Sequence, residues 1–254
     1  MQFADFVSQN QVFITQELLE ATESSQSARV ALSRAVRFGK VQKVRNGLYV
    51  SQAGKFQDAK ADPYLIATTF RPDAVFAYHS ALELHGLAHS VFGRVQFMTC
   101  KVAPVFSHEG IGFNSLSLRP AILTETLSAR AFGSVIVTTR EQTLVDCMAK
   151  VALAGGAEEV VRSFTGLPYV DISAILLCLK HYPPSVAARV GWYLEANQKR
   201  WVVPNNTLAT IEGMTSSRAS YKLDPTLKHF EEYSSRWRLS LPATQDVITT
   251  WMEL

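Results

Sequence analysis

Residues 25–50 read SQSARVALSRAVRFGKVQKVRNGLYV and begin with the pattern of an amphipathic helix. Small and apolar residues recur three or four positions apart, at Ala28, Ala31, Leu32, Ala35 and Val36. This spacing predicts a helix that buries one face, because a strand would alternate at every second position. The serines just before Ala28 offer an N-cap hydroxyl, and Gly39 offers the left-handed residue that ends a helix.

A β-hairpin is predicted directly after this helix. Two alternating runs, residues 40–44 and 48–50, flank the Asn46-Gly47 pair. Asn-Gly tolerates the positive φ angles of a type I′ turn, which joins two antiparallel strands. We therefore expect Arg45 and Asn46 at the tip of the hairpin.

The outward face of the predicted helix is basic. With Ala28 at the centre of the buried face, about 100° per residue places Arg37 on the opposite side, and Arg29 and Arg34 on the flanks. From Ser27 to Lys55 there is no Asp or Glu, and there are seven cations: Arg29, Arg34, Arg37, Lys40, Lys43, Arg45 and Lys55. Duplex phosphate favours such a surface.

The positive charge is confined to the start of the chain. The 254 residues carry a net charge of +3. Residues 1–60 hold 8 basic and 5 acidic side chains, and residues 61–254 hold 17 of each. A polyanion-binding head on a neutral body is therefore predicted.

Other patterns exclude several classes of protein. Cys100, Cys147 and Cys178 lie far apart without a C-x-x-C pair, so neither a zinc site nor a disulfide framework is predicted. We expect three reduced core cysteines, no cofactor and a cytoplasmic protein. The first residues lack a signal pattern, and no apolar run approaches about eighteen residues, so no membrane span is expected.

The element order predicts two domains. A short helix with Phe3, Phe6 and Val7, a strand at 12–14 and a helix at 16–22 precede the basic helix and hairpin. This is the order of a winged helix-turn-helix. We predict that domain over 1–52, a linker over 53–61, and a larger mixed α/β (α+β) domain over 62–254.

The body shows strand and helix patterns in alternation. Asp62-Pro63 predicts a capped helix to Phe70, and Thr139-x-x-Gln142 predicts a capping box. Strands are predicted at 74–78, 95–99, 113–119, 134–138 and within 234–242, and further helices at 172–182 and 186–197. No element is predicted in the polar stretch 205–221.

Residues 78–86, YHSALELHG, contain a serine and two histidines. These residue types make a catalytic nucleophile or a pair of metal ligands a candidate for this segment. Ser80-x-x-Glu83 fits a capping box, and Gly86 fits a helix end. A serine hydrolase prefers its serine between glycines, and His79 and His85 lack a third ligand at helical spacing. The favoured interpretation is a helix cap, with no catalytic residue.

An enzyme is not predicted elsewhere either. A restriction-type nuclease needs Glu-x-Lys after an acidic residue, and the chain has no Glu-x-Lys. A nucleotidyltransferase uses Gly-Ser followed by paired acids to hold two metal ions, and this pattern is missing as well. A DNA-targeted defence nuclease is therefore the weaker alternative.

Several strings together resemble the AbiEi family of antitoxins and transcriptional regulators of type IV abortive-infection toxin-antitoxin systems. They are RNGLYV, DPYLIA, HSALELHGL, TTREQTLVD, GGAEEVV, ARVGWYLE and SRWRLSLP, in this order. The resemblance implies a DNA-binding head that represses its own operon from inverted repeats. It also implies a C-terminal domain that counteracts a nucleotidyltransferase toxin without requiring direct contact. Gln142 departs from the arginine that this family often has there.

Sequence-specific duplex binding is thus the leading hypothesis. The predicted DNA-contacting residues are Gln26, Ser27, Arg29, Val30, Ser33, Arg34, Arg37, Lys43, Arg45 and Asn46. The first half of the helix is expected at base edges, Arg29 and Arg34 at phosphates, and Arg45 in a minor groove.

Two alternatives remain open. In the first, the arginines form an ordinary solvated face that the helix dipole favours. In the second, the body is a ligand-sensing or protein-interaction module.

Overall fold

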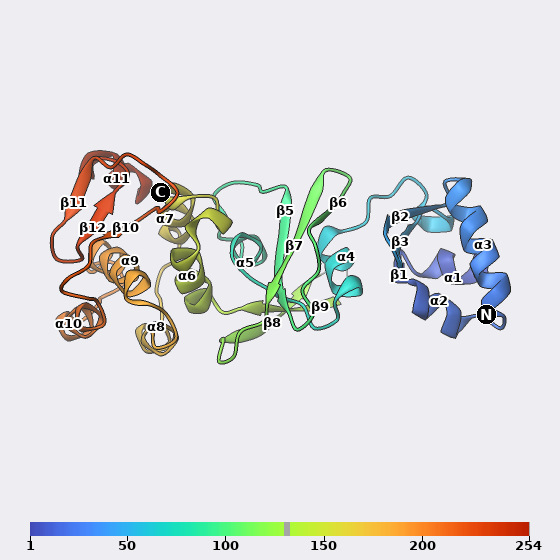
Figure 1. The fold of residues 1–254 in the computed structure, drawn as a ribbon, viewed down its shortest axis with the longest axis horizontal. Helices are drawn as coiled ribbons and strands as arrows, with labels where there is room; N and C mark the ends of the chain where they lie inside the picture. The colour runs from blue at the N-terminus through green and yellow to red at the C-terminus, as the bar shows by residue number, and fades with distance from the viewer. Residues whose placement is uncertain (130–132, 254) are drawn as a thin grey trace. The chain divides into compact units, whose positions relative to one another are not determined.

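The computed structural model describes residues 1–129 and 133–253 (Figure 1). Helices and strands are mixed along the chain, so the predicted α/β (α+β) class is confirmed. The chain divides into two compact units. Unit 1 holds the described residues of 1–74, 93–117 and 128–135, and unit 2 holds those of 75–92, 118–127 and 136–254. The predicted division at a linker over 53–61 stays a prediction.

Unit 1 begins with the elements that were predicted. They are α1 (Phe3–Gln9), β1 (Val12–Ile14), α2 (Thr15–Ala21), α3 (Ser25–Arg37), β2 (Val41–Arg45) and β3 (Leu48–Ser51). The three strands form an antiparallel sheet in the order β1-β3-β2. Phe13 is completely buried, with Phe6 edge-on at 5.3 Å and Tyr49 stacked at 5.7 Å between ring centroids. This aromatic cluster joins the sheet to the helices.

Helix α3 begins and ends as its sequence predicts. The Ser24 hydroxyl accepts a hydrogen bond from the Ser27 amide at 3.3 Å, which identifies Ser24 as the N-cap. Gly39 follows the helix with a φ of +71°, the left-handed conformation that glycine adopts without strain. Ala28, Leu32 and Ala35 are buried, so the apolar spacing faces the core.

The hairpin between β2 and β3 differs from the prediction in its turn. Gly47 has a φ of +82°, but Asn46 is not among the residues with positive φ. A type I′ turn needs positive φ at both central residues, so that prediction is wrong. The register shifts between Lys43 and Arg45, which places Arg45 opposite Leu48. Such a bulge increases the local twist and changes the direction of a side chain.

The rest of unit 1 contains a 3₁₀ helix, an α-helix and a second set of strands. Its elements are η1 (Gly54–Phe56), α4 (Pro63–Phe70), β5 (Arg94–Thr99), β6 (Phe106–His108) and β7 (Ile111–Ser117). Asp62 caps α4 as predicted, since its carboxylate accepts from the Tyr64 amide at 2.8 Å. Strand β7 pairs parallel with β5 and antiparallel with β6.

Unit 2 consists mainly of helices around one apolar core. Its elements are β4 (Val75–Phe76), α5 (His79–Leu84), α6 (Arg140–Ala149), η2 (Val151–Leu153), α7 (Ala157–Thr165), α8 (Ile172–Leu179), α9 (Pro184–Ala196), α10 (Asn205–Gly213), β10 (Tyr221–Lys222), β11 (Glu232–Ser234), β12 (Leu239–Leu241) and α11 (Gln245–Trp251). Strands β8 (Thr124–Ala129) and β9 (Gly133–Thr138) contribute residues to both units, and β9 pairs parallel with β4. Helix α10 lies where no element was predicted, and it buries Leu208 and Ile211.

Two predicted capping boxes are corrected. Helix α5 begins at His79 after Tyr78, which has a φ of +56°, so Ser80 is not its N-cap. Thr139 does cap α6 by accepting from the Gln142 amide at 3.3 Å. The Gln142 side chain, however, donates to the Tyr182 hydroxyl at 2.8 Å rather than reaching back to the cap.

The cysteines and the membrane prediction can also be compared with the structure. Cys147 and Cys178 are buried as expected, but Cys100 is exposed, so its predicted place in the core is wrong. Within the described residues, no helix combines the length and the apolar character that crossing a membrane requires.

Candidate nucleic-acid interface

Helix α3 presents all seven of its predicted contact residues to solvent. They are Gln26, Ser27, Arg29, Val30, Ser33, Arg34 and Arg37. Val30 is 44 % exposed although it is apolar, so this side chain is free to contact a partner. In β2 and its turn, Lys43 and Asn46 are exposed as well.

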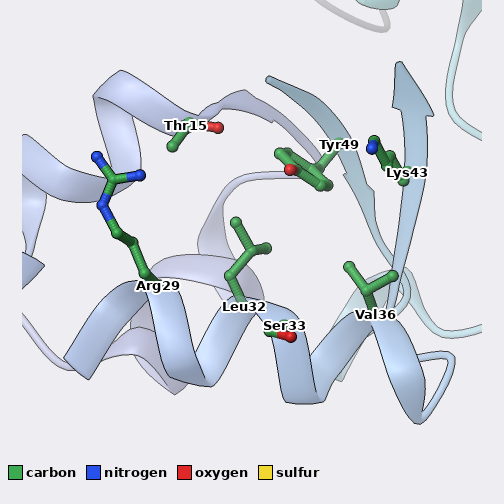
Figure 2. Close-up of a pocket in the computed structure, with 7 residues that line it drawn as sticks. All are labelled: Thr15, Arg29, Leu32, Ser33, Val36, Lys43 and Tyr49. Carbon is green, nitrogen blue, oxygen red and sulfur yellow. The ribbon is translucent and has the colours of Figure 1, made fainter. Parts of the chain in front are cut away.

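A groove of about 340 Å³ runs between α3 and the hairpin (Figure 2). It is lined by Thr15, Arg29, Leu32, Ser33, Val36, Lys43 and Tyr49. Figure 2 shows Arg29 and Lys43 at opposite ends of this groove, with Thr15 and Tyr49 between them. Two cations and three hydroxyl groups therefore line one concave surface, a combination that suits phosphate oxygens.

Sequence reasoning missed Thr15 and Tyr49. Tyr49 pairs with Lys43 in the hairpin register, so the alternation of the strands carried a signal for it. Thr15 is the first residue of α2, and no hydrogen bond of its hydroxyl is found among the described residues, since at this helix start the Ile14 amide donates to Glu17 at 2.9 Å. The Thr15 hydroxyl therefore remains available to the groove.

The cations of this surface have no acidic partners. We call Arg29, Arg34, Arg37, Lys40 and Lys43 the basic face; all five are exposed, and none forms an ion pair within the described residues. The acids of α2 are engaged locally, since Glu17 binds the Ile14 amide and Glu20 accepts from Gln16 at 2.8 Å. The positive potential of the basic face is thus not neutralised in place.

The helix dipole explains only part of this pattern. Arg34 and Arg37 lie in the last turn of α3, where the dipole favours a cation. Arg29 lies in the first half of the helix and gains nothing from it. The solvated-face interpretation therefore leaves Arg29 and Lys43 without an explanation.

Arg45 does not stand free at the hairpin tip. Its guanidinium carbon lies 4.5 Å from the ring centroid of Phe70 and 4.8 Å from that of Phe106. Burial, together with the charge of Arg71, lowers the pKa of Arg45. The predicted role of Arg45 in a minor groove does not fit this geometry, because the side chain is held against two rings.

Unit 2 contains a buried histidine between two carboxylates. His79 is fully buried, with Nδ1 3.2 Å from Glu83 and Nε2 3.2 Å from Glu159. Burial alone would raise the pKa of Glu159, but hydrogen bonds from Ser90 and the nearby His79 hold it below its usual value. This network connects α5 with α7 inside unit 2. Among the described residues, no group of three or more His, Cys, Asp or Glu side chains is placed to hold a metal ion.

A second buried charge lies under a small cavity of unit 2. Asp146 is completely buried and accepts hydrogen bonds from Arg119 and Tyr182. Burial raises the pKa of Asp146, and it also raises the pKa of the neighbouring Cys178 to about 12. A cavity of about 230 Å³ opens beside them, lined by Arg119, Pro120, Ala121, Ile122, Gln142, Cys178, His181 and Tyr182. The Cys178 thiol stays protonated at neutral pH and is a poor nucleophile.

Comparisons with known proteins give a likeness in fold. No family model matches the chain, and no curated protein matches it by sequence. A crystal structure of the RV2827C protein from Mycobacterium tuberculosis is similar, with a TM-score of 0.67 and 14 % sequence identity. The likeness covers 93 % of this chain and 88 % of that chain. The two chains therefore share a fold over most of their length.

Proposed function

We propose that the chain is a transcriptional repressor whose winged helix-turn-helix head binds duplex DNA through α3 and the β2-β3 hairpin. The observation that carries this proposal is the basic face: five exposed cations beside a groove, none of which forms an ion pair with the acids that the structure describes. Phosphates attract such a surface, and releasing their counterions supplies much of the affinity.

The proposal assigns different roles along α3. Gln26, Ser27 and Val30 lie in the first half of the helix, the part that meets base edges in helix-turn-helix proteins. Val30 suits a thymine methyl, and Gln26 suits the edge of an adenine. Arg29 and Lys43, at the two ends of the groove, contact phosphates and fix the register of the helix on the duplex.

The biological role rests on the resemblance to the AbiEi family. In this proposal the chain represses its own operon from inverted repeats and is the antitoxin of a type IV system. Unit 2 then counteracts a nucleotidyltransferase toxin without direct contact. A variant with Arg29→Ala and Arg37→Ala separates the two roles: it should lose repression while it still protects cells that express the toxin.

A salt titration tests DNA binding directly. Affinity for the promoter of the chain's own operon, measured by fluorescence anisotropy, should fall steeply between about 50 and 200 mM salt. The variant Arg29→Ala with Arg37→Ala should bind more weakly and with a shallower slope. Arg140→Ala with Arg218→Ala removes the same charge from exposed positions of unit 2 and should bind like the unchanged chain. Weak binding that does not respond to salt would contradict the proposal.

The Arg119 cavity favours a second candidate, a regulator whose body senses a small ligand. A cavity of about 230 Å³ lies beside the half-buried Arg119 and the buried Asp146, and its lining mixes polar and apolar groups as small-molecule sites do. A panel of nucleotides and small carboxylates can be screened by thermal shift. A ligand that raises the melting temperature of the unchanged chain, but not of Arg119→Ala, and that alters DNA affinity would favour sensing.

A further inference from the structure

Two arginines of unit 1 share one aromatic ring. Arg71, which follows α4, has its guanidinium carbon 4.0 Å from the centroid of Phe70. Arg45, from β2, lies 4.5 Å from the same centroid and 4.8 Å from that of Phe106. Phe106 in turn stacks on Phe113, with centroids 4.7 Å apart and ring planes at 3°. The hairpin is thereby fixed to α4 and β6.

Neither guanidinium has a counter-ion in the part of the chain that the structure describes. Asp73, two residues after Arg71, accepts from the Thr99 hydroxyl at 2.8 Å and from the Cys100 amide at 2.7 Å. Its carboxylate is therefore committed to the loop after β5. Two like charges remain close together without an acid between them.

The hydrogen-bond donors of the pair are incompletely used. Arg71 donates from Nε to the Lys101 carbonyl at 2.8 Å and from Nη1 to the Phe70 carbonyl at 3.1 Å, which leaves its Nη2 group. Arg45 Nη1 is buried and has no hydrogen-bond partner. A buried donor without a partner loses its hydration and gains nothing in return. Aromatic rings attract the cations but accept no strong hydrogen bond.

We propose that Arg45 and Arg71 together bind one phosphate group of the DNA backbone, beside the hairpin turn. Guanidinium groups match phosphate oxygens in geometry, and one backbone phosphodiester, which carries a single negative charge, would accept from the remaining Nη2 group of Arg71 and reduce the repulsion between the two cations. Arg45 pairs with Leu48 at the turn, so this phosphate would flank the segment that the hairpin contacts. The exposed Lys101, whose carbonyl holds Arg71, adds positive charge nearby.

This inference rests on the proposed DNA binding, and a set of salt titrations tests it. Arg45→Gln and Arg71→Gln should each weaken duplex binding roughly tenfold and reduce the salt slope by about 1. Because both side chains hold the same phosphate, the double variant should bind no more weakly than either single variant. Arg45→Lys keeps the charge and should keep the slope, and Arg218→Gln in unit 2 is the control for charge alone.

A second measurement uses inorganic phosphate as the probe and needs no DNA. Phosphate should raise the melting temperature of the unchanged chain more than chloride at equal ionic strength, and this difference should vanish in Arg45→Gln and Arg71→Gln. If phosphate raises the melting temperature but Arg45→Gln and Arg71→Gln leave the salt slope of duplex binding unchanged, the pair binds a free phosphate compound and not the DNA backbone. If the two variants leave the salt slope unchanged and phosphate does not raise the melting temperature, the proposed phosphate site is wrong.

The two proposals fail in different ways. If the unchanged chain does not bind duplex in a salt-dependent manner, the proposed function fails, and the phosphate measurement still decides the arginine pair. If the chain binds and the basic face is needed, but neither arginine affects slope or protection, only the phosphate site fails.

Discussion

Individual residues determine how closely the elements of unit 2 approach each other. Gly191 lies in α9 against Trp237, which is completely buried and donates from its indole nitrogen to Glu195 at 2.6 Å. A Cβ at position 191 would lie 2.2 Å from Cζ3 of Trp237, far inside van der Waals contact. Because a buried indole cannot move aside cheaply, this close approach requires glycine.

Gly191→Ala should therefore destabilise the protein. We expect a loss of about 1–3 kcal/mol in the free energy of unfolding, the range for overpacking a filled core. Urea denaturation measures it. Gly213→Ala is the matched control, since no atom lies within 4 Å of its added Cβ and its φ is not positive. Equal stabilities of the two variants would contradict the packing argument.

The Glu159 carboxylate should make stability depend on acid pH. Its pKa is lower in the folded chain than in the unfolded chain, so the unfolded chain takes up the proton first. The stability that Glu159 contributes is present above its unfolded pKa and is lost as the pH falls through its folded pKa. The free energy of unfolding should therefore decline on acidification below about pH 4.5.

Glu159→Gln isolates this contribution. The pKa of Asp146 is shifted upward, so Asp146 changes the stability of the chain with pH in the opposite direction. The test therefore compares the free energy of unfolding of the unchanged chain with that of Glu159→Gln at each pH, because Asp146 affects both equally. The stability gap between the unchanged chain and Glu159→Gln should narrow as the pH falls from about 6 to about 3. A gap that stays constant across this range would show that the ionised form of Glu159 gains nothing from Ser90 and His79.

Among the elements, α3 was predictable because its signals are local. The apolar spacing, a serine before the helix and Gly39 after it all act within a few residues. The exposure of seven contact residues followed from the same geometry. The N-cap hydroxyl of Ser24 is one of these local signals, and its energy can be measured.

Ser24→Ala should cost about 1 kcal/mol of stability, the usual effect of losing a capping hydroxyl. The reason is that the Ser27 amide at the first turn loses its acceptor. Chemical denaturation should show the loss, and Ser24→Gly should recover most of it. Ser25→Ala, one position later and equally exposed, should be near neutral. A neutral Ser24→Ala variant would mean that water replaces the cap without cost.

Elements that depend on distant residues were not predictable. The string Ser80-x-x-Glu83 matches a capping box, yet His79 enters α5 because Glu159 from α7 and Glu83 lie on either side of its ring. The contacts of Arg45 with the rings of Phe70 and Phe106 were missed, because both partners come much later in the chain. Helix α10 was missed because its sequence is polar and only Leu208 and Ile211 face the core.

At the scale of the whole molecule, an inverted-repeat operator requires two heads at half-sites about one helical turn apart. No heptad seam is visible in the sequence, so we expect two chains to bind as independent monomers. Sedimentation of the protein with operator duplex should give two chains per duplex. Inserting about five base pairs rotates one half-site to the opposite face of the duplex. Both affinities should stay unchanged, because chains that bind independently do not need to face each other. A loss of affinity on insertion would show that the two chains contact each other.

The exposed position of Cys100 makes the unmodified sequence suitable for site-specific labelling. The other two thiols, Cys147 and Cys178, are buried, and burial raises the pKa of each, so a maleimide dye should react at Cys100 alone. Hydrogen bonding to Asp73 raises the pKa of Cys100, so labelling should be faster at mildly alkaline pH. The next residue, Lys101, holds Arg71 through its carbonyl. A fluorophore there would therefore test the proposed duplex binding in real time, without any engineered cysteine.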